Sequence, residues 1–351
     1  MPSCPVPWPV PPRVPRREPA GGRPPAAAPA PPIRPAPARG RRPRHPLSER
    51  RPPVTPRTPA APFACRRCAL ALERRTHLVG VLNVTPDSFS DGGAFLDPGA
   101  AVEHALQMAA EGADCIDIGG ESTRPGAPPI SAEEEWARIG PVLTRLVGRC
   151  PVPLAVDTTK AAVAARALEA GVAIVNDVSA LRFDPALGSV VAEAGAGLIL
   201  MHMQGTPRTM QERPSYGDVV ADVRAFLAER LAAATAAGIP SEAILLDPGI
   251  GFGKTVEHNL TLLRHLPELT TLGRPLLVGP SRKSFIGAVL GTPVTDRLEG
   301  TAAAVALAIA GGAAAVRVHD VKAMARVARM CDAILGRGVP HVGAAERVPV
   351  A

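Results

Sequence analysis

Three polar side chains, two carboxylates and one amide, each come directly after a short run of apolar residues. They are Asp157, Asn176 and Asp247. A carboxylate accepts two hydrogen bonds from adjacent N–H groups, and an amide both donates and accepts. Together these groups could hold a flat nitrogen heterocycle with an amidine-like N–C–N edge. A purine-like or pterin-like ring is therefore the guest that we expect for them.

A second group of side chains is suited to phosphate oxygens. Four cations follow or end two later apolar runs, namely Arg282, Lys283, Arg317 and His319. Asn83 and the hydroxyl of Thr123 add oxygen atoms of the kind that bind Mg²⁺ when the ion bridges a diphosphate. These residue types predict a substrate with a diphosphate leaving group and Mg²⁺ as the cofactor.

The elements that must position these residues alternate regularly from residue 78 onward. Apolar runs, expected as strands, lie at 78–84, 115–118, 154–156, 174–176, 198–201, 244–246, 276–278 and 315–318. Stretches of helical period, expected as helices, lie at 99–112, 131–148, 159–171, 185–195, 217–238, 256–266, 296–311 and 320–336. Such alternation is typical of βα units and a parallel sheet. Eight units favour an α/β fold, the (β/α)8 TIM barrel, over a doubly wound open sheet.

Nearly every apolar run ends in a polar cluster. The clusters are Asn83, Glu121 to Arg124, Asp157, Asn176 with Asp177, His202, Asp247, Ser281 to Lys283, and Arg317 with His319. In a barrel the carboxyl ends of all strands meet at one face, which carries the active site, and phosphate groups usually bind beside the last two strands. Polar residues also occur at the starts of loops and as helix caps. These ordinary roles would explain one or two of the clusters, but not all eight.

Two segments rich in glycine, proline and polar residues, 84–93 and 121–126, are candidate lids that order on substrate binding. Excluding water would matter, because loss of diphosphate from a methylene leaves an electron-poor carbon. A third segment, Gly249–Thr255, resembles the sequence motif of a nucleotide-binding loop. That motif requires glycine where Pro248 stands, so we do not expect a nucleotide there.

The first 62 residues differ in composition from the rest. They hold 22 of the 41 prolines and 12 arginines against two acids, a net charge of +10, so residues 63–351 carry −3 of the total +7. Without periodic apolar residues they cannot offset the entropy of ordering. We expect a disordered Pro/Arg-rich tail (1–62), a catalytic domain (63–340) and a flexible C-terminus (341–351). A solvated linker or a misassigned start codon accounts for the tail better than an acidic partner does.

No apolar stretch is long enough to span a bilayer, and no secretory or transit signal is evident. A cytoplasmic protein with small-molecule substrates, without nucleic-acid or membrane partners, is therefore expected. The six cysteines are scattered, which favours reduced thiols. Cys65 and Cys68 form an isolated CxxC, better explained as hairpin positions than as a zinc or redox site.

The chain from about residue 63 to 340 resembles dihydropteroate synthase. The matching motifs, all in the order of that family, are 82–93, 120–126, 156–158, 175–178, 200–205, 246–249, 279–285 and 316–320. The resemblance implies a transferase of folate biosynthesis and a sulfonamide target. It would condense (7,8-dihydropterin-6-yl)methyl diphosphate with 4-aminobenzoate to give 7,8-dihydropteroate and diphosphate. It also implies a homodimer formed through helices on the outer wall of the barrel, such as residues 302–310.

The same resemblance implies a role for each matching residue. The pterin-binding set is Asp157, Asn176, Met201, Asp247, Phe252 and Lys283. The diphosphate set is Asn83, Thr123, Arg317 and His319, with Asn83 also the Mg²⁺ ligand. The 4-aminobenzoate set is Phe89, Pro125, Lys283 and Ser284, and the catalytic set is Asp157, Lys283, Asp91 and Arg124. One departure is Ile250, which stands where many relatives have phenylalanine.

Two other functions fit parts of this pattern. A methyltransferase that moves a methyl group from a reduced folate to a corrinoid would share the pterin residues, but it would not require segments 84–93 or 281–283. A synthase-like paralogue without turnover would show damage in the lids or in the pterin set, and this chain shows none.

Overall fold

The computed structural model describes residues 63–65, 68–85 and 97–338. Eight parallel strands form one sheet in the order β8-β7-β6-β5-β4-β3-β10-β9. They are β3 (His77–Asn83), β4 (Cys115–Gly119), β5 (Leu154–Asp157), β6 (Ile174–Asp177), β7 (Gly197–Met201), β8 (Ile244–Asp247), β9 (Leu277–Val278) and β10 (Ala315–Val318). A parallel bridge between Leu246 and Leu276 brings the two outer strands together. The sheet is a nearly closed barrel, which confirms the predicted fold class.

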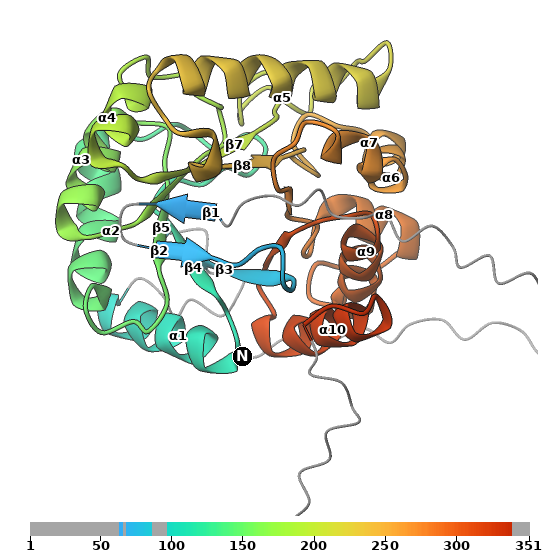
Figure 1. Cartoon of the computed structure of the whole chain (residues 1–351), viewed down its shortest axis with the longest axis horizontal. Helices are drawn as coiled ribbons and strands as arrows, with labels where there is room; N and C mark the ends of the chain where they lie inside the picture. Colours follow the sequence, from blue (N-terminus) through green and yellow to red (C-terminus); the bar gives the residue numbers. More distant parts are fainter. Residues whose placement is uncertain (1–62, 66–67, 86–96, 339–351) are drawn as a thin grey trace, which may run out of the picture. The chain divides into compact units, whose positions relative to one another are not determined.

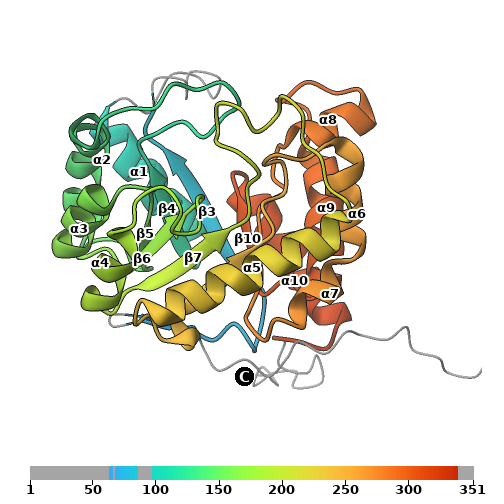
Figure 2. The same cartoon turned by 90° about the horizontal axis from the view of Figure 1, so that it is seen from above.

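Helices surround the strands, as the ring in Figure 1 and the turned view in Figure 2 show. They are α1 (Pro98–Glu111), α2 (Ala132–Leu146), α3 (Ala161–Ala170), α4 (Leu187–Ala194), α5 (Val219–Ala236), α6 (Val256–Arg264), α7 (Leu266–Thr270), α8 (Ser284–Leu290), α9 (Leu298–Ala310) and α10 (Val321–Ile334). None of the helices in the described ranges is long and apolar enough to cross a membrane.

The eight predicted helices are present, and two short ones, α7 and α8, were missed. The missed α8 has seven residues, too few to show a helical period. Its position matters, because it places Lys283 as the N-cap of a helix at the barrel mouth.

Local signals set the helix ends. The hydroxyl of Ser131 accepts a hydrogen bond from the backbone N–H of Glu134 at 3.1 Å and so caps the start of α2. Asp97 caps α1 in the same way, with proline at the first helical position. At the other end, Gly112 leaves α1 in the left-handed conformation that glycine adopts without strain.

Residues that face the barrel interior change from apolar to polar along five of the eight strands. One apolar cluster takes a residue from every strand, namely Val79, Cys115, Ala155, Ile174, Ile199, Leu245, Leu277 and Ala315. Two residues further on stand Val81, Asp117, Asp157, Asn176, Met201, Asp247, Gly279 and Arg317. Side chains two apart on a strand share a face, so this second layer also points inward, at the carboxyl ends of the strands. The alternate residues pack outward against the helices in the main core.

A hairpin covers the opposite end of the barrel. Strands β1 (Phe63–Cys65) and β2 (Cys68–Leu70) pair antiparallel, with Cys65 opposite Cys68, which confirms the hairpin prediction. Phe63 is fully buried, and a Cβ atom at Gly197 would lie 2.4 Å from its ring. Glycine is therefore required at the start of β7. Cys68 is disulfide-bonded, so the expectation that all cysteines are reduced is wrong at this position.

Several predictions concern residues outside the described ranges. The tail (1–62), the C-terminus (341–351) and most of the first candidate lid, including Phe89 and Asp91, belong to them. The predictions about these segments stay predictions.

Candidate active site

A cavity of about 390 Å³ lies at the carboxyl ends of the barrel strands. Of the predicted site residues, ten line it: Asn83, Thr123, Arg124, Pro125, Asp157, Phe252, Lys283, Ser284, Arg317 and His319. Three more, Asn176, Met201 and Asp247, are at most 1 % exposed and belong to the inward-facing layer. The fold therefore brings residues from eight separate segments of the chain, one at or after each strand, to one place.

A polar cluster joins four strands in this layer, namely β4, β5, β6 and β10. The carboxylate Oδ2 of Asp117 accepts hydrogen bonds from Asn176 Nδ2 at 2.9 Å and from Arg317 Nη1 at 3.0 Å. The same Arg317 nitrogen lies 3.8 Å from Asp157 Oδ2. Arg317 is thus the cation that compensates two neighbouring carboxylates.

Sequence reasoning missed Asp117. It lies inside the apolar run of β4, and we read only the ends of such runs as functional positions. A carboxylate within a run that is otherwise apolar is itself a signal, because a buried charge needs a partner elsewhere in the fold.

Two oxygen atoms of this cluster have no hydrogen-bond partner within the described part of the chain. They are Oδ1 of Asp117 and Oδ1 of Asn176, both buried. Most buried polar atoms in proteins are paired, so such orphaned acceptors are suited to N–H donors from a ligand. This arrangement matches the N–H-rich heterocycle that the sequence indicated.

The carboxyl groups of Asp157 and Asp247 lie in surroundings that disfavour the charged form. Burial, and next to it the charge of Asp117, raises the pKa of Asp157 to about 8, although its side chain remains 19 % exposed. Burial also raises the pKa of Asp247, whose Oδ1 accepts a hydrogen bond from the backbone N–H of Gly249 at 2.7 Å. A ligand that donates hydrogen bonds to these groups would favour their charged forms.

One wall of the site is apolar and carries a cation. The ammonium of Lys283 lies 4.0 Å from the centre of the Phe252 ring, within the range of a cation–π contact. Burial, and then the charge of Arg317, lowers the pKa of Lys283 to about 7. Phe252 packs in a small cluster with Val178, Met201, Met203 and Met210. Ile250, the departure from the family pattern, packs instead in the main core and does not belong to this wall.

One residue of the diphosphate set, His319, is held by a neighbouring hydroxyl. The ring Nδ1 of His319 lies 3.0 Å from Ser281 Oγ, and its backbone N–H donates to the same oxygen at 3.2 Å. Arg282, which the sequence grouped with the phosphate cations, instead pairs with Asp320 through two hydrogen bonds of 3.0 and 2.7 Å. Its backbone adopts φ 56°, a sparsely populated conformation for a residue with a side chain. We infer that the pair of Arg282 with Asp320 stabilises this turn.

Not every polar residue at a strand end faces the cavity. Met201 and Asn176 point inward, so His202 and Asp177, one position later, point outward. Asp177 accepts hydrogen bonds from two backbone N–H groups of the following turn, and His202 is buried beside Lys254. The expectation that all eight clusters contribute to one face is wrong for these two residues.

The second candidate lid begins at an ion pair. Lys160 Nζ lies 2.5 Å from Glu121 Oε2 and 2.7 Å from Glu135 Oε2, and Glu135 is fully buried. Glu121 therefore anchors the base of the lid and does not enter the cavity lining. Further along the same loop, Arg124 and Pro125 are exposed at the rim.

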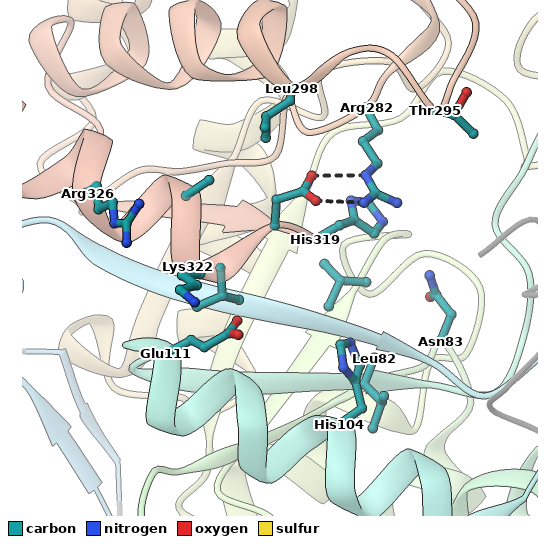
Figure 3. Close-up of a pocket in the computed structure, with 14 residues that line it drawn as sticks. Leu82, Asn83, His104, Glu111, Arg282, Thr295, Leu298, His319, Lys322 and Arg326 are labelled. Atoms are coloured by element: carbon teal, nitrogen blue, oxygen red, sulfur yellow. Dashed lines mark hydrogen bonds and ion pairs between the residues drawn. The ribbon is translucent and has the colours of Figure 1, made fainter. Parts of the chain in front are cut away.

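A second groove, of about 630 Å³, adjoins the cavity between α1 and α10. Figure 3 shows Lys322 and Arg326 of α10 on one side and His104 and Glu111 of α1 on the other. The two hollows share Val81, Asn83, Arg282 and His319. Two of the predicted diphosphate residues, Asn83 and His319, therefore lie between the barrel mouth and the groove.

The site offers few resident ligands for a metal. No group of three or more His, Cys, Asp or Glu side chains that could hold an ion occurs among residues 63–65, 68–85 and 97–338. Asn83 and Asp157 both line the cavity and both present an oxygen atom near Gly119, since a Cβ atom there would lie 3.9 Å from Asn83 Oδ1 and 3.8 Å from Asp157 Oδ2. This pair fits Mg²⁺ that arrives with a substrate, because Mg²⁺ usually takes one or two protein oxygens together with phosphates and water.

Comparison with known proteins agrees with this geometry. Residues 79–319 match the family model described as pterin binding enzyme. Dihydropteroate synthase of Synechocystis sp. is 50 % identical over 262 residues, which cover 74 % of this chain and 91 % of the relative.

Two solved structures share the fold. Yersinia pestis dihydropteroate synthase, solved with a sulfonamide drug, superposes with a TM-score of 0.76 at 43 % identity and covers 79 % of this chain and all of its own. Xanthomonas albilineans dihydropteroate synthase, solved with 7,8-dihydropteroate, gives 0.70 at 44 % identity over 79 % of this chain and 98 % of its own. By sequence and by structure, the chain belongs to the pterin binding enzymes and, among them, to the dihydropteroate synthases.

Proposed function

We propose that this chain is a transferase that condenses (7,8-dihydropterin-6-yl)methyl diphosphate with 4-aminobenzoate, releasing diphosphate and 7,8-dihydropteroate. The observation that carries the proposal is the inward-facing set Asp117, Asp157, Asn176 and Arg317, whose orphaned acceptors lie below a cavity lined by the predicted substrate residues. A corrinoid methyltransferase would share the acceptors, but it would not need the cations beside them.

The pterin ring would lie against the inward-facing layer. Asp157, Asn176 and Asp247 supply acceptors for its N–H groups, and Phe252 with Met201 forms an apolar wall. Asp157 in its carboxylate form would stabilise positive charge that develops on the ring as diphosphate leaves. Electrostatic groups oriented before the reaction often supply the largest share of catalysis.

The diphosphate would lie between Asn83, Thr123, Arg317 and His319. We propose that Mg²⁺ enters with the diphosphate and takes Asn83 as a ligand, with Asp157 beside it. Bound there, the ion would neutralise charge on the phosphate oxygens and make diphosphate a better leaving group. Arg317 adds a permanent charge, because neighbouring carboxylates keep its pKa above its ordinary value although burial alone would lower it.

The second substrate would approach from the rim. The aniline nitrogen supplies the electron pair of the new C–N bond, the C–O bond breaks with its pair remaining on diphosphate, and the nitrogen releases one proton. Lys283 and Ser284, at the start of α8, would hold the carboxylate, and Pro125 would contact the ring from the second lid. Phe89, Asp91 and Arg124 would complete the site as the lids close, and sulfonamide drugs would compete for the same region.

Diphosphate release by the purified full-length chain tests this proposal. With Mg²⁺ and the pterin diphosphate, release should depend on added 4-aminobenzoate and should match the dihydropteroate formed. Chelation of Mg²⁺ should abolish release, and added Mg²⁺ should restore it, because the leaving group would otherwise keep its full charge. Tight pterin binding without release would instead identify a non-catalytic paralogue.

We further propose that the chain forms a homodimer through its outer wall. An apolar groove of about 530 Å³ lies there, lined by residues of α6 to α9. Three large apolar side chains at this groove are unusually exposed for the described part of the chain: Leu307 (65 %), Val289 (56 %) and Leu290 (52 %). A contiguous exposed apolar surface is typical of a protein interface, and a symmetric pair of identical subunits is the commonest arrangement.

Replacing Leu307 by glutamate should give monomers, because it places a charge in the middle of this surface. Light scattering after size-exclusion chromatography would report the mass. Met330→Glu is the matched control, since Met330 is 62 % exposed on α10, outside the groove, and should leave the dimer intact. Equal masses for wild type and Leu307→Glu would contradict a dimer at this face.

A further inference from the structure

The loop that follows β8 turns back on itself beside the pterin residues. Gly249, Gly251 and Gly253 all adopt positive φ, of 67°, 85° and 60°. A Cβ atom at Gly249 would lie 1.9 Å from the carbonyl oxygen of His202, so a side chain is excluded there. The glycines that imitate a nucleotide-binding loop therefore serve a tight turn packed against the end of β7.

Lys254 is the cation of that motif, and it points back beneath the loop. The residue is 3 % exposed. Its Nζ lies 2.9 Å from three acceptors, which are the carbonyl oxygens of Gly249 and Phe252 and the Nδ1 of His202. An ammonium has three N–H donors, so these acceptors use all of them. Lys254 is consequently part of the protein interior and has no donor left for a phosphate.

The neutral state of His202 is consistent with this contact. Burial, followed by the charge of Lys254, lowers the pKa of His202 to about 2. A neutral imidazole can accept through Nδ1 only when its proton is on Nε2. The ring therefore acts as a fixed acceptor for Lys254.

Two side chains from the connection between β7 and α5 hold more of the loop. Tyr216 Oη donates to the carbonyl oxygen of Gly253 at 2.6 Å, and Gln211 Nε2 donates to that of Gly251 at 3.0 Å. The carbonyl groups of residues 249, 251, 252 and 253 thus all accept from a side chain. This leaves the loop backbone little freedom to rearrange.

The loop in turn positions two residues of the candidate site. It carries Phe252, whose ring lies 4.0 Å from the ammonium of Lys283. A Cβ atom at Gly251 would lie 2.9 Å from Lys283 Cδ, so the loop backbone also touches the stem of that lysine. A displacement of the loop would move the ring and the cation together.

We propose that Lys254, Tyr216 and Gln211 are positioning residues, which hold loop 249–253 so that Phe252 and Lys283 are in place before the pterin arrives. The inference rests on the proposed function, because the pterin is the ligand. A preformed pocket loses less binding energy to ordering than a mobile one does. Removing these hydrogen bonds should therefore weaken binding of the pterin ring even when it carries no diphosphate.

Titration calorimetry of the full-length chain with 6-hydroxymethyl-7,8-dihydropterin, which lacks diphosphate, tests this. Tyr216→Phe removes one hydroxyl and should raise Kd about fivefold, the usual effect of one hydrogen bond. Lys254→Met keeps the length of the side chain, removes three donors, and should raise Kd about 30-fold or more on the same scale. Arg329→Met, which removes an exposed cation of α10, is the control and should leave Kd unchanged.

Amide hydrogen exchange separates positioning from general stability. In Tyr216→Phe, the amides of residues 249–253 should exchange faster in the free protein and regain wild-type protection with pterin bound, while those of β3 and β4 stay unchanged. Faster exchange throughout the barrel with a wild-type Kd would overturn the proposal. If Lys254→Met does not fold, Tyr216→Phe decides, because it loses a single oxygen atom. A wild-type protein that does not bind the pterin at all would overturn the proposed function, and this inference with it.

Discussion

Replacing Asp157 by asparagine should lower kcat by about 100- to 1,000-fold, the usual cost of removing one group that stabilises developing charge. The substitution keeps the size of the side chain but removes the negative charge that faces the pterin. Steady-state rates of diphosphate release would measure the loss. Glu193→Gln, which removes an exposed carboxylate from α4, is the control and should keep the wild-type rate.

The same variant should change the pH dependence. In the free wild-type protein the pKa of Asp157 is about 8, so its ionisation should make kcat/KM for the pterin diphosphate rise with pH on the acidic side of the profile. Asp157→Asn has no such group, and the rise should disappear. A wild-type profile that is flat between pH 6 and 9 would contradict this role.

Asp157→Asn should also make the fold more stable. Burial raises the pKa of Asp157 in the folded state to about 8, whereas the unfolded chain ionises at the ordinary value. The free energy of unfolding therefore falls as the pH rises above that ordinary value, and the full loss is reached above about pH 8. Asparagine has no such cost. The melting temperature at pH 9 should therefore increase, by roughly 2 to 4 °C for each kcal/mol gained in a domain of this size. A lower melting temperature would show that the contact with Arg317 outweighs the cost of burial.

Replacing Lys283 by alanine should weaken binding of both substrates, with KM raised about 10- to 100-fold for each, as expected for hydrogen bonds to a charged group. Lys283 lies against Phe252 and begins α8 next to Ser284, so it stands between the pterin and 4-aminobenzoate regions. Initial-rate measurements with each substrate varied in turn would separate the two KM values.

The alkaline side of the pH profile offers a second readout for Lys283. Its pKa is about 7 in the free protein, so kcat/KM should fall as the ammonium loses its proton above that value. Lys283→Ala should lack the fall, whereas Arg329→Ala, an exposed cation on α10, should retain it. Wild-type KM values for both substrates in Lys283→Ala would refute the shared role.

The sequence by itself determined the order of the elements and most of the candidate site. Strand alternation and helical period are local properties, so the eight βα units could be read without a structure. A parallel barrel then requires the ends of its strands to meet, which is why Asp157, Asp247 and Arg317 could be grouped although they are far apart in the chain. The family motifs named the roles of these residues, and those roles stay predictions.

Only the tertiary structure decided which polar side chains contact each other. Asp117 and Arg317 are 200 residues apart. Their contact depends on the register of the barrel strands, which cannot be read from a local sequence pattern. Met201 points into the barrel and His202, the next residue, points outward, because successive side chains of a strand lie on opposite faces.

Two lysines near the barrel mouth, Lys254 and Lys283, illustrate the same limit. Lys254 and Lys283 both follow glycine-rich or polar turns near the barrel mouth, and the pKa of each is lowered to about 7 by burial. Lys254 finds all its acceptors in its own loop and in His202, whereas Lys283 lies against an aromatic ring at the cavity. Their surroundings come from packing between segments distant in sequence, and this is why residue type and spacing predicted a cationic site but could not show that Arg282 pairs with Asp320 or that Lys254 is enclosed by its own loop.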